Sequence, residues 1–387
     1  MTEFEFLEPD FLDEDLRMVR DQVRRFSKER IVPFADAWEA SGEIPRALFR
    51  ELGELGFLGM RHPVEYGGGG LGPLASVVLG EELARSGYGG VASALTVHSD
   101  MSISHIAHRG SHEQKQKYLP DACAGRKVGA VCVTEPGAGS DVAGLRTRGE
   151  RMADGGWLIN GSKTFITNGV HGDIYIVAAR TDPEAKGSRG ISLFIVEKDN
   201  PGLKITRQFD KHGWRSSDTA ELFFDDLTLP ADALLGEEGK GFYYIMGTFQ
   251  NERLVVGALV SGTCARAIEL TVDYVRQRQA FGKSLWDQQV VRNKLAWMAS
   301  KAAAVRALTY QCALMIEQGK DTVREVSMLK AFGAETLQEV VHTCLQLHGG
   351  TGFITGTPVE RMARDARILT IGGGATEVML EEVAKRM

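Results

Sequence analysis

The sequence predicts an α+β protein made of a helical part, a β part and a second helical part. Before about residue 125 and again after residue 242, apolar residues recur at three- and four-residue steps, as amphipathic helices require. The stretch between them contains short β-branched runs and frequent turn pairs, which are typical of antiparallel β structure. The 387 residues are enough for two or three domains. The expected domains are an N-terminal helical domain (1–125), a middle β-barrel domain (126–237) and a C-terminal helical bundle (238–387).

Composition excludes several classes of protein. The net charge of −6 and the pI of about 5.9 argue against nucleic-acid binding, which usually needs a basic surface. We expect no apolar stretch long enough to span a membrane. The acidic N-terminus lacks a signal or transit pattern, so we expect a cytoplasmic protein. The five cysteines form no CxxC pair, and no carboxylate or thiolate completes a ligand set around the nearby histidines, so no metal is expected. Those histidines are His98, His105, His108 and His112.

The N-terminal part is expected to contain several helices. An apolar stripe from Leu16 to Phe26 defines the first of them. The four glycines at 67–70 are not followed by GK[ST], so they are expected to connect helices and not to bind a nucleotide phosphate. Further helices are expected at 46–56, 75–84 and 101–107.

The middle part is expected to form antiparallel strands. The β-branched runs are 128–133, 157–159, 174–178, 191–197, 203–205 and 222–224. Asn160-Gly161 and Asn168-Gly169 are both hairpin turn signals.

The C-terminal part is expected to be a bundle of long helices. Helical periodicity extends over 242–278, 288–318 and 323–347, and a short last helix follows Gly374. Glycines 349 and 350 are expected to end the third long helix.

A glycine-rich loop, TEPGAGSD, follows the first expected strand. Pro136, Gly137 and Gly139 prevent a helix and allow tight turns. The exposed peptide N–H groups, together with the hydroxyls of Thr134 and Ser140, suit the polar edge of a flat ring system. The motif alone is more often an ordinary turn between strands.

Glu252 is a candidate general base. It lies on the apolar stripe of the helix from 242, between Phe249 and Val256, with no cation three or four residues away. Apolar surroundings should raise its pKa from about 4.3, which suits proton removal near neutral pH. The alternative is an ion pair between Glu252 and a cation from another helix.

Three motifs resemble the acyl-CoA dehydrogenase family of flavoproteins. They are TEPGAGSD, NGSKTFITNG from residue 160 and RQAFGK from residue 278. The resemblance extends from about residue 10 to the end and is closest to the long-chain and isovaleryl-CoA types. It implies a three-domain fold, an FAD cofactor and a homo-oligomer, expected as a tetramer.

The position of the candidate base, Glu252, also favours the long-chain and isovaleryl-CoA types. Most of the family places a catalytic Glu in a Tyr-Glu-Gly-Thr loop near the C-terminus, where this chain has Gly373. The long-chain and isovaleryl branches place it on the helix, in an ERL setting like that of Glu252, Arg253 and Leu254. The resemblance therefore implies Glu252 as the base, and the backbone N–H of Gly373 is the expected donor to the thioester carbonyl.

The resemblance also implies the remaining site residues. Phe165 should lie against the flavin ring and Thr167 near its reactive nitrogen. Arg278 should meet the pyrophosphate of a neighbouring subunit's cofactor. Thr376 is further expected to cap the last helix, whereas Ala375 replaces a threonine that is usual in the family. The full flavin set is Val133, Thr134, Ser140, Phe165, Thr167, Arg278, Phe281, Gln289, Gln346, Gly350, Thr376 and Glu377, and the substrate set is Ser140, Tyr243, Phe249 and Arg253.

The implied activity is the α,β-dehydrogenation of an acyl-CoA to the trans-2-enoyl thioester, as in fatty acid β-oxidation. The implied electron acceptor is an electron-transferring flavoprotein. Three alternatives remain open: a thioester on a carrier protein in secondary metabolism, an oxidase that reduces O₂, and a flavin-binding relative without catalysis. Acyl chain length and branching are also open.

Overall fold

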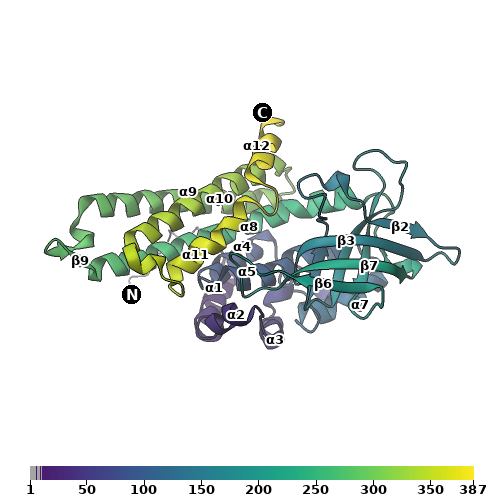
Figure 1. Ribbon diagram of the computed structural model, residues 1–387, viewed down its shortest axis with the longest axis horizontal. Coiled ribbons are helices and arrows are strands. Elements are labelled where there is room, and N and C mark those ends of the chain that lie inside the picture. The colour runs from purple at the N-terminus through teal and green to yellow at the C-terminus, as the bar shows by residue number, and fades with distance from the viewer. Residues whose placement is uncertain (1–5, 7–8, 10) are drawn as a thin grey trace.

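The computed structural model describes residues 6, 9 and 11–387, so most of the acidic N-terminal segment lies outside the described residues. Helices, then a sheet, then a helical bundle follow one another along the chain (Figure 1). The α+β fold class expected from the sequence is therefore confirmed. The sheet and the tip of the bundle lie at opposite ends of an elongated molecule.

The N-terminal helices pack around a central buried helix, α4. Asp13 caps the N-terminus of the first helix, since its Oδ1 accepts the Leu16 N–H at 2.8 Å. The expected stripe of this helix faces the core through Leu16, Val23 and Phe26. Nearly all of α4 is buried, because it contacts α1, α5, α8 and α9. The helices are α1 (Glu14–Phe26), α2 (Ala35–Ser41), α3 (Arg46–Glu54), α4 (Pro73–Ala84), α5 (Gly89–Thr96), α6 (Ile103–Arg109) and α7 (His112–Cys123).

The strands form one large sheet in the order β6-β7-β3-β2-β4-β5-β8, with β1 paired to β4. The ladder between β1 and β4 is parallel, and the chain between these strands passes through β2 and β3. Among the described residues β6 and β8 are the two ends of this strand order. The strands are β1 (Gly129–Cys132), β2 (Arg148–Arg151), β3 (Trp157–Thr167), β4 (Ile174–Arg180), β5 (Ile191–Glu197), β6 (Leu203–Gln208), β7 (Thr219–Leu229) and β8 (Leu234–Leu235).

The two Asn-Gly pairs do not make hairpins. Asn160-Gly161 lies inside β3 at a bulge, where Gly161 has φ +150° and a methyl group at this position would lie 2.6 Å from Thr147 Oγ1. The N–H of Asp226 on β7 donates to the Asn160 side-chain Oδ1 at 2.8 Å. Asn168-Gly169 does turn the chain, but it joins β3 to β4, which are not neighbours in the sheet.

The C-terminal bundle is built on α8, which contacts α4, α9 and α10 and touches β5. By length and composition this helix could span a membrane, because an 18-residue window of it has a mean hydropathy of 1.4. The expectation that the chain contains no such stretch is therefore wrong. Since 78% of that window is buried inside the protein, α8 is a core helix. The bundle comprises α8 (Gly241–Gln277), α9 (Gln289–Glu317), α10 (Val323–His348), α11 (Pro358–Ala366) and α12 (Thr376–Ala384), with a short hairpin of β9 (Gln279–Ala280) and β10 (Lys283–Ser284) after α8.

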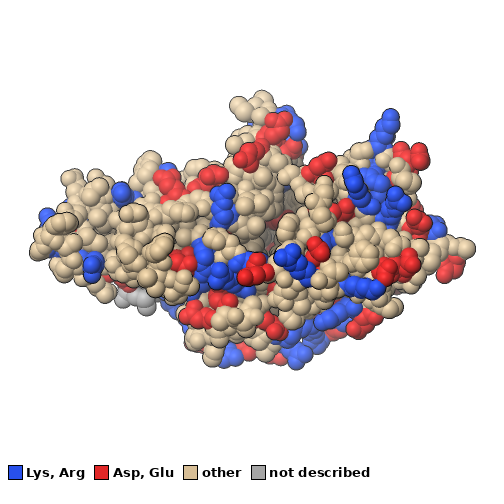
Figure 2. Space-filling view, viewed as in Figure 1, with Lys and Arg blue, Asp and Glu red and all other residues tan. Residues whose placement is uncertain are grey.

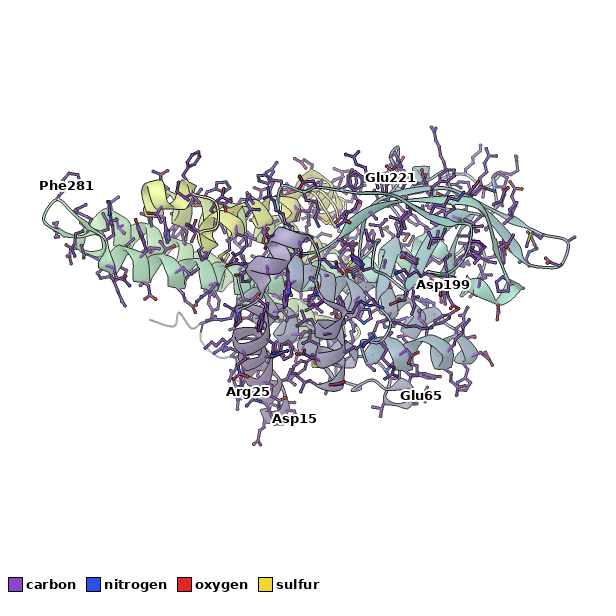
Figure 3. The ribbon with its side chains drawn as sticks, turned by 60° about the horizontal axis from the view of Figure 1, so that its bottom comes forward. Asp15, Arg25, Glu65, Asp199, Glu221 and Phe281 are labelled. Atoms are coloured by element: carbon purple, nitrogen blue, oxygen red, sulfur yellow. The ribbon has the colours of Figure 1, made fainter. Side chains whose placement is uncertain are left out.

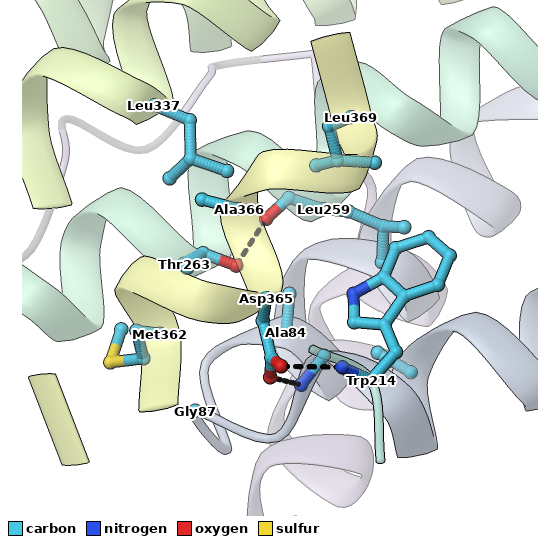
Figure 4. A pocket seen from close by; sticks show the side chains of 12 residues that line it. Ala84, Gly87, Trp214, Leu259, Thr263, Leu337, Met362, Asp365, Ala366 and Leu369 are labelled. Carbon is cyan, nitrogen blue, oxygen red and sulfur yellow. Dashed lines mark hydrogen bonds between the residues drawn. The ribbon is translucent and has the colours of Figure 1, made fainter. Parts of the chain in front are cut away.

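One buried carboxyl group joins all three domains. Asp365 on α11 accepts the N–H of Trp214, in the connection from β6 to β7, at 2.6 Å and that of Gly89, at the start of α5, at 3.1 Å (Figure 4). Burial raises the pKa of Asp365 to about 7 despite these donors. The small pocket beside it is lined mainly by apolar side chains. We assign Asp365 to domain packing and not to catalysis.

Candidate active site

Glu252 and Gly373 lie together, as the resemblance implies. Glu252 lies in the first half of α8, and Gly373 lies in the turn before α12. A methyl group at position 373 would lie 2.8 Å from Glu252 Oε1, and Gly373 has φ +66°, where side chains are rarely accommodated. The carboxylate therefore occupies the space that a side chain at position 373 would need.

The surroundings of Glu252 differ from those of a structural ion pair. Within the described part of the chain, no salt bridge includes Glu252, and its buried Oε2 has no hydrogen-bond partner. Burial raises the pKa of Glu252 to about 7, although Arg253 and Lys330 pull it downward. A carboxyl with this pKa exchanges a proton readily near neutral pH, as a general base must.

The glycine-rich loop is held by a buried ion pair that the sequence analysis did not anticipate. Lys163 on β3 is fully buried, and its Nζ donates to Glu135 Oε1 at 2.8 Å and to the Val133 carbonyl at 3.0 Å. Glu135 also accepts the N–H groups of Arg146 and Thr147, at 2.6 and 2.9 Å. Burial alone would raise the pKa of Glu135, but Lys163 and these N–H groups outweigh it and hold the pKa below its ordinary value.

The other side of this loop is open. The hydroxyls of Thr134, Ser140 and Thr167 make no hydrogen bond to any residue that the structure describes. Methyl groups at Gly137 and Gly139 would meet no atom within 4 Å. The loop thus presents unpaired donors and acceptors to open space.

Phe165 lies next to this loop on β3. The adjacent Thr164 N–H donates to the Thr134 carbonyl at 2.9 Å, which brings strand and loop together. Phe165 has φ +60°, is 65% exposed and contacts the Phe209 ring at 5.2 Å. An aromatic face is therefore exposed beside free hydroxyls, a combination that suits a flat heteroaromatic ring.

Five further predicted flavin residues lie at the far end of the molecule. The β9–β10 hairpin projects from the bundle, and Phe281 at its tip is 96% exposed (Figures 1 and 3). The end of α10 lies near the base of this hairpin, since the Tyr274 hydroxyl donates to the His348 carbonyl at 3.1 Å. A single chain does not bring this group to the glycine-rich loop. The group comprises Arg278, Phe281, Gln289, Gln346 and Gly350, all exposed.

Thr376 does not cap α12, contrary to the expectation. Ala375 occupies the cap position, and the Thr376 hydroxyl donates to Glu335 on α10 at 3.0 Å instead. Glu377 is exposed in the first turn of α12.

The predicted substrate residues differ in exposure. Tyr243 is 52% exposed, Phe249 is half-buried, and Arg253 is buried with an unpaired Nε. Lys330, like Lys163, was missed: it is fully buried on α10, and its Nζ donates to the Gly374 carbonyl.

Gly373→Ala is expected to impair catalysis far more than stability. The methyl group would displace the Glu252 carboxylate and would strain a left-handed residue by about 1 kcal/mol. We expect at least a tenfold loss in the rate of flavin reduction, measured by stopped-flow absorbance. Gly372→Ala is the matched control, because its methyl group would meet only atoms at 3.6 Å or beyond. Equal rates in the two variants would contradict this account.

Three family models together cover almost the whole chain. The acyl-CoA dehydrogenase N-terminal domain matches residues 13–126, the middle domain residues 130–227 and the C-terminal domain residues 239–387. Fold and site thus define a flavin-dependent oxidoreductase that acts on CH–CH bonds. The chain belongs to the acyl-CoA dehydrogenase family.

Individual relatives agree with this assignment. Long-chain specific acyl-CoA dehydrogenase of Rattus norvegicus is 41% identical over 369 residues, which cover 95% of this chain and 85% of the relative. Isovaleryl-CoA dehydrogenase of Pongo abelii is 37% identical over 370 residues, covering 95% and 87%. The crystal structure of an acyl-CoA dehydrogenase from Geobacillus kaustophilus is 41% identical and superposes with a TM-score of 0.94, covering 98% of this chain and 99% of that one.

Proposed function

We propose that this enzyme removes the α proton and the β hydride of an acyl-CoA with Glu252 as the base, and passes the electrons to an electron-transferring flavoprotein. The observation that supports this most directly is the unpaired carboxylate of Glu252 against Gly373. The similarity of the chain to long-chain and isovaleryl-CoA dehydrogenases favours a long or branched acyl group as the substrate.

FAD is the proposed cofactor, and the open loop fits it. The hydroxyls of Thr134, Ser140 and Thr167 would bond the polar edge of the flavin, while Phe165 would cover one face of the ring. A bound flavin supplies an acceptor for the hydride that leaves the β carbon.

The chain's own groups would handle the proton and the developing charge. Glu252 would accept the α proton at a carboxylate oxygen. The resulting enolate-like oxygen needs hydrogen-bond donors. The Gly373 N–H is available, because it makes no hydrogen bond to any described residue. The buried surroundings of Glu252 limit competing contact with water, which strengthens both interactions.

A homo-oligomer, proposed as a tetramer, would complete the cofactor site. Phe281, at the tip of the β9–β10 hairpin that follows Arg278, lies at the opposite end of the molecule from the sheet that contains β3 (Figures 1 and 3). A second copy could bring its hairpin to the glycine-rich loop of the first. Sedimentation should then give a mass well above the 42.3 kDa of one chain, and a flavin-loaded monomer would refute the proposal.

Nucleic acid is not a proposed partner. On the face that Figure 2 shows, Lys and Arg side chains are interspersed with Asp and Glu. This face therefore lacks the broad basic field that binds a phosphate backbone. The same view shows a hollow where α12 faces the β domain.

The pKa of Glu252 leads to a defined pH dependence. Since burial raises that pKa to about 7, kcat/KM should fall as pH decreases through about 7 and the carboxylate is protonated.

The same raised pKa predicts how stability depends on pH. The unfolded chain should release the proton of Glu252 near pH 4.3, so between about pH 4.3 and 7 the folded state binds more protons. Stability contributed by this group should therefore fall as pH rises across that window. Glu252→Gln should remove this slope from the free energy of unfolding, and an unchanged slope would contradict the raised pKa.

An anaerobic titration would test the proposed function. The purified flavin-loaded protein would receive acyl-CoAs from short to long, including branched chains, while the oxidised flavin absorbance is followed. Bleaching by one class would establish the dehydrogenation and identify its substrate. If no acyl-CoA bleaches a fully loaded protein, the function proposed here is wrong, and carrier-bound thioesters become the next substrates to assay.

A further inference from the structure

We propose that Lys330 is a positioning residue for the active site: its buried ammonium fixes the turn that contains Gly373 and places a positive charge near Glu252. This inference rests on the proposed function, because it assigns a role beside the same base. It concerns a residue that would touch neither substrate nor flavin.

Lys330 connects the parts of the bundle that form the site. It lies on α10, which packs against both α8 and α12. Its side chain is fully buried, and Nζ donates to the carbonyl of Gly374. Gly373 and Gly374 both have positive φ, at +66° and +101°, so this turn has little regular structure of its own to hold it. The bond from Lys330 therefore fixes the peptide between Gly374 and Ala375, two peptide units after the one that carries the proposed donor N–H of Gly373.

The burial of Lys330 is not explained by an ion pair. No salt bridge among the described residues includes it, and burial lowers its pKa to about 8. A buried ammonium without a carboxylate partner is costly, so packing alone would favour an apolar side chain here. Glu252 is likewise unpaired, which leaves two opposite charges in one poorly solvated region.

The charged groups around this pair come from three helices. Arg253 on α8 and Lys330 on α10 both lower the pKa of Glu252. Glu335 on α10 and Glu377 on α12 act on Lys330. Two further groups, Glu382 and Arg386, influence Arg253. Lys330 is thus one of two cations that favour the ionised base, and it is the one that also holds the turn.

Lys330→Met removes the charge and the donor while keeping a long side chain. We expect the acid limb of the kcat/KM profile to move up by about one pH unit, because a nearby positive charge no longer favours the carboxylate. At pH 6 this alone corresponds to about a tenfold loss. The plateau at higher pH should fall as well, since the turn loses its hydrogen bond. A purely structural role would lower stability and flavin content but leave the acid limb in place.

Lys330→Gln separates the loss of the positive charge from the loss of the hydrogen bond to the turn. It also replaces Lys330→Met in this test if the Met variant does not bind flavin. Its amide is neutral, so the acid limb should still move, whereas a donor remains near the turn. Lys301→Met is the control, since that ammonium on α9 pairs with Glu339 and should leave the profile unchanged. An acid limb that stays in place in the flavin-loaded Met or Gln variant overturns the proposal.

Proton linkage allows the pKa of Glu252 to be measured without catalytic turnover. The pH dependence of the free energy of unfolding, compared with and without Glu252→Gln, reports the pKa of Glu252 directly. We expect the window of declining stability to extend to higher pH in Lys330→Gln. If the wild type is not reduced by any acyl-CoA but this shift occurs, the proposed function fails and the electrostatic role of Lys330 stands. If the wild type is reduced and the shift is absent, the role of Lys330 fails alone.

Discussion

Glu252→Gln should keep its flavin and lose reduction by acyl-CoA, with kcat/KM lower by about 10³-fold, inside the 10²–10⁴ range that a positioned base contributes. The amide has nearly the same shape as the carboxyl group but cannot accept the α proton. Anaerobic stopped-flow absorbance would give the rate of flavin bleaching, and the oxidised spectrum would give the flavin content. Both are needed, because loss of cofactor would imitate loss of the base.

The control for this experiment is Glu339→Gln, which removes a carboxylate that pairs with Lys301 outside the site. It should be reduced at the wild-type rate. If Glu252→Gln is also reduced at that rate, another group removes the proton, and the unpaired carboxylate beside Gly373 needs a different explanation.

Lys163→Met should destabilise the β domain and release the flavin. The substitution leaves Glu135 buried without its cation, a situation that costs about 3–5 kcal/mol in other proteins. Lys163 also donates to the Val133 carbonyl at 3.0 Å, so the glycine-rich loop loses both hydrogen bonds that Lys163 makes to it. Urea denaturation and flavin absorbance after gel filtration would measure the two effects.

The double variant Glu135→Gln with Lys163→Met is the control for the ion pair. A neutral amide can still accept the N–H groups of Arg146 and Thr147 without leaving a buried charge. We therefore expect the double variant to be more stable than Lys163→Met alone. If it is less stable, the cost comes from lost packing of the lysine and not from the unpaired carboxylate.

Local patterns were sufficient to predict most elements of the fold. The apolar periodicity that predicts a helix over 242–278 corresponds to α8, and the β-branched run at 174–178 corresponds to β4. Asn160-Gly161 was misread because its backbone conformation is set by Thr147 and Asp226, which lie elsewhere in the chain. The strand β2, with the sequence RGER, contains no apolar residue, so no periodicity identifies it.

The candidate site was only partly predictable for a similar reason. Glu252 stands out because its own helix supplies the apolar stripe and no cation, whereas Phe165 emerged only from the family resemblance. Lys163 and Lys330 gave no signal, since their partners Glu135 and Gly374 lie 28 and 44 residues away. The expected cap at Thr376 failed because Glu335, 41 residues distant, takes its hydroxyl.

The close approach of Glu252 to Gly373 restricts how the base can change position during evolution. An ancestor with glutamate at both positions would force two carboxylates into space that holds one, and each would oppose ionisation of the other. An ancestor with glutamate at neither position would have no base. We therefore expect every path by single substitutions between the two arrangements to pass through an impaired enzyme, so that a working base can move only if both positions change.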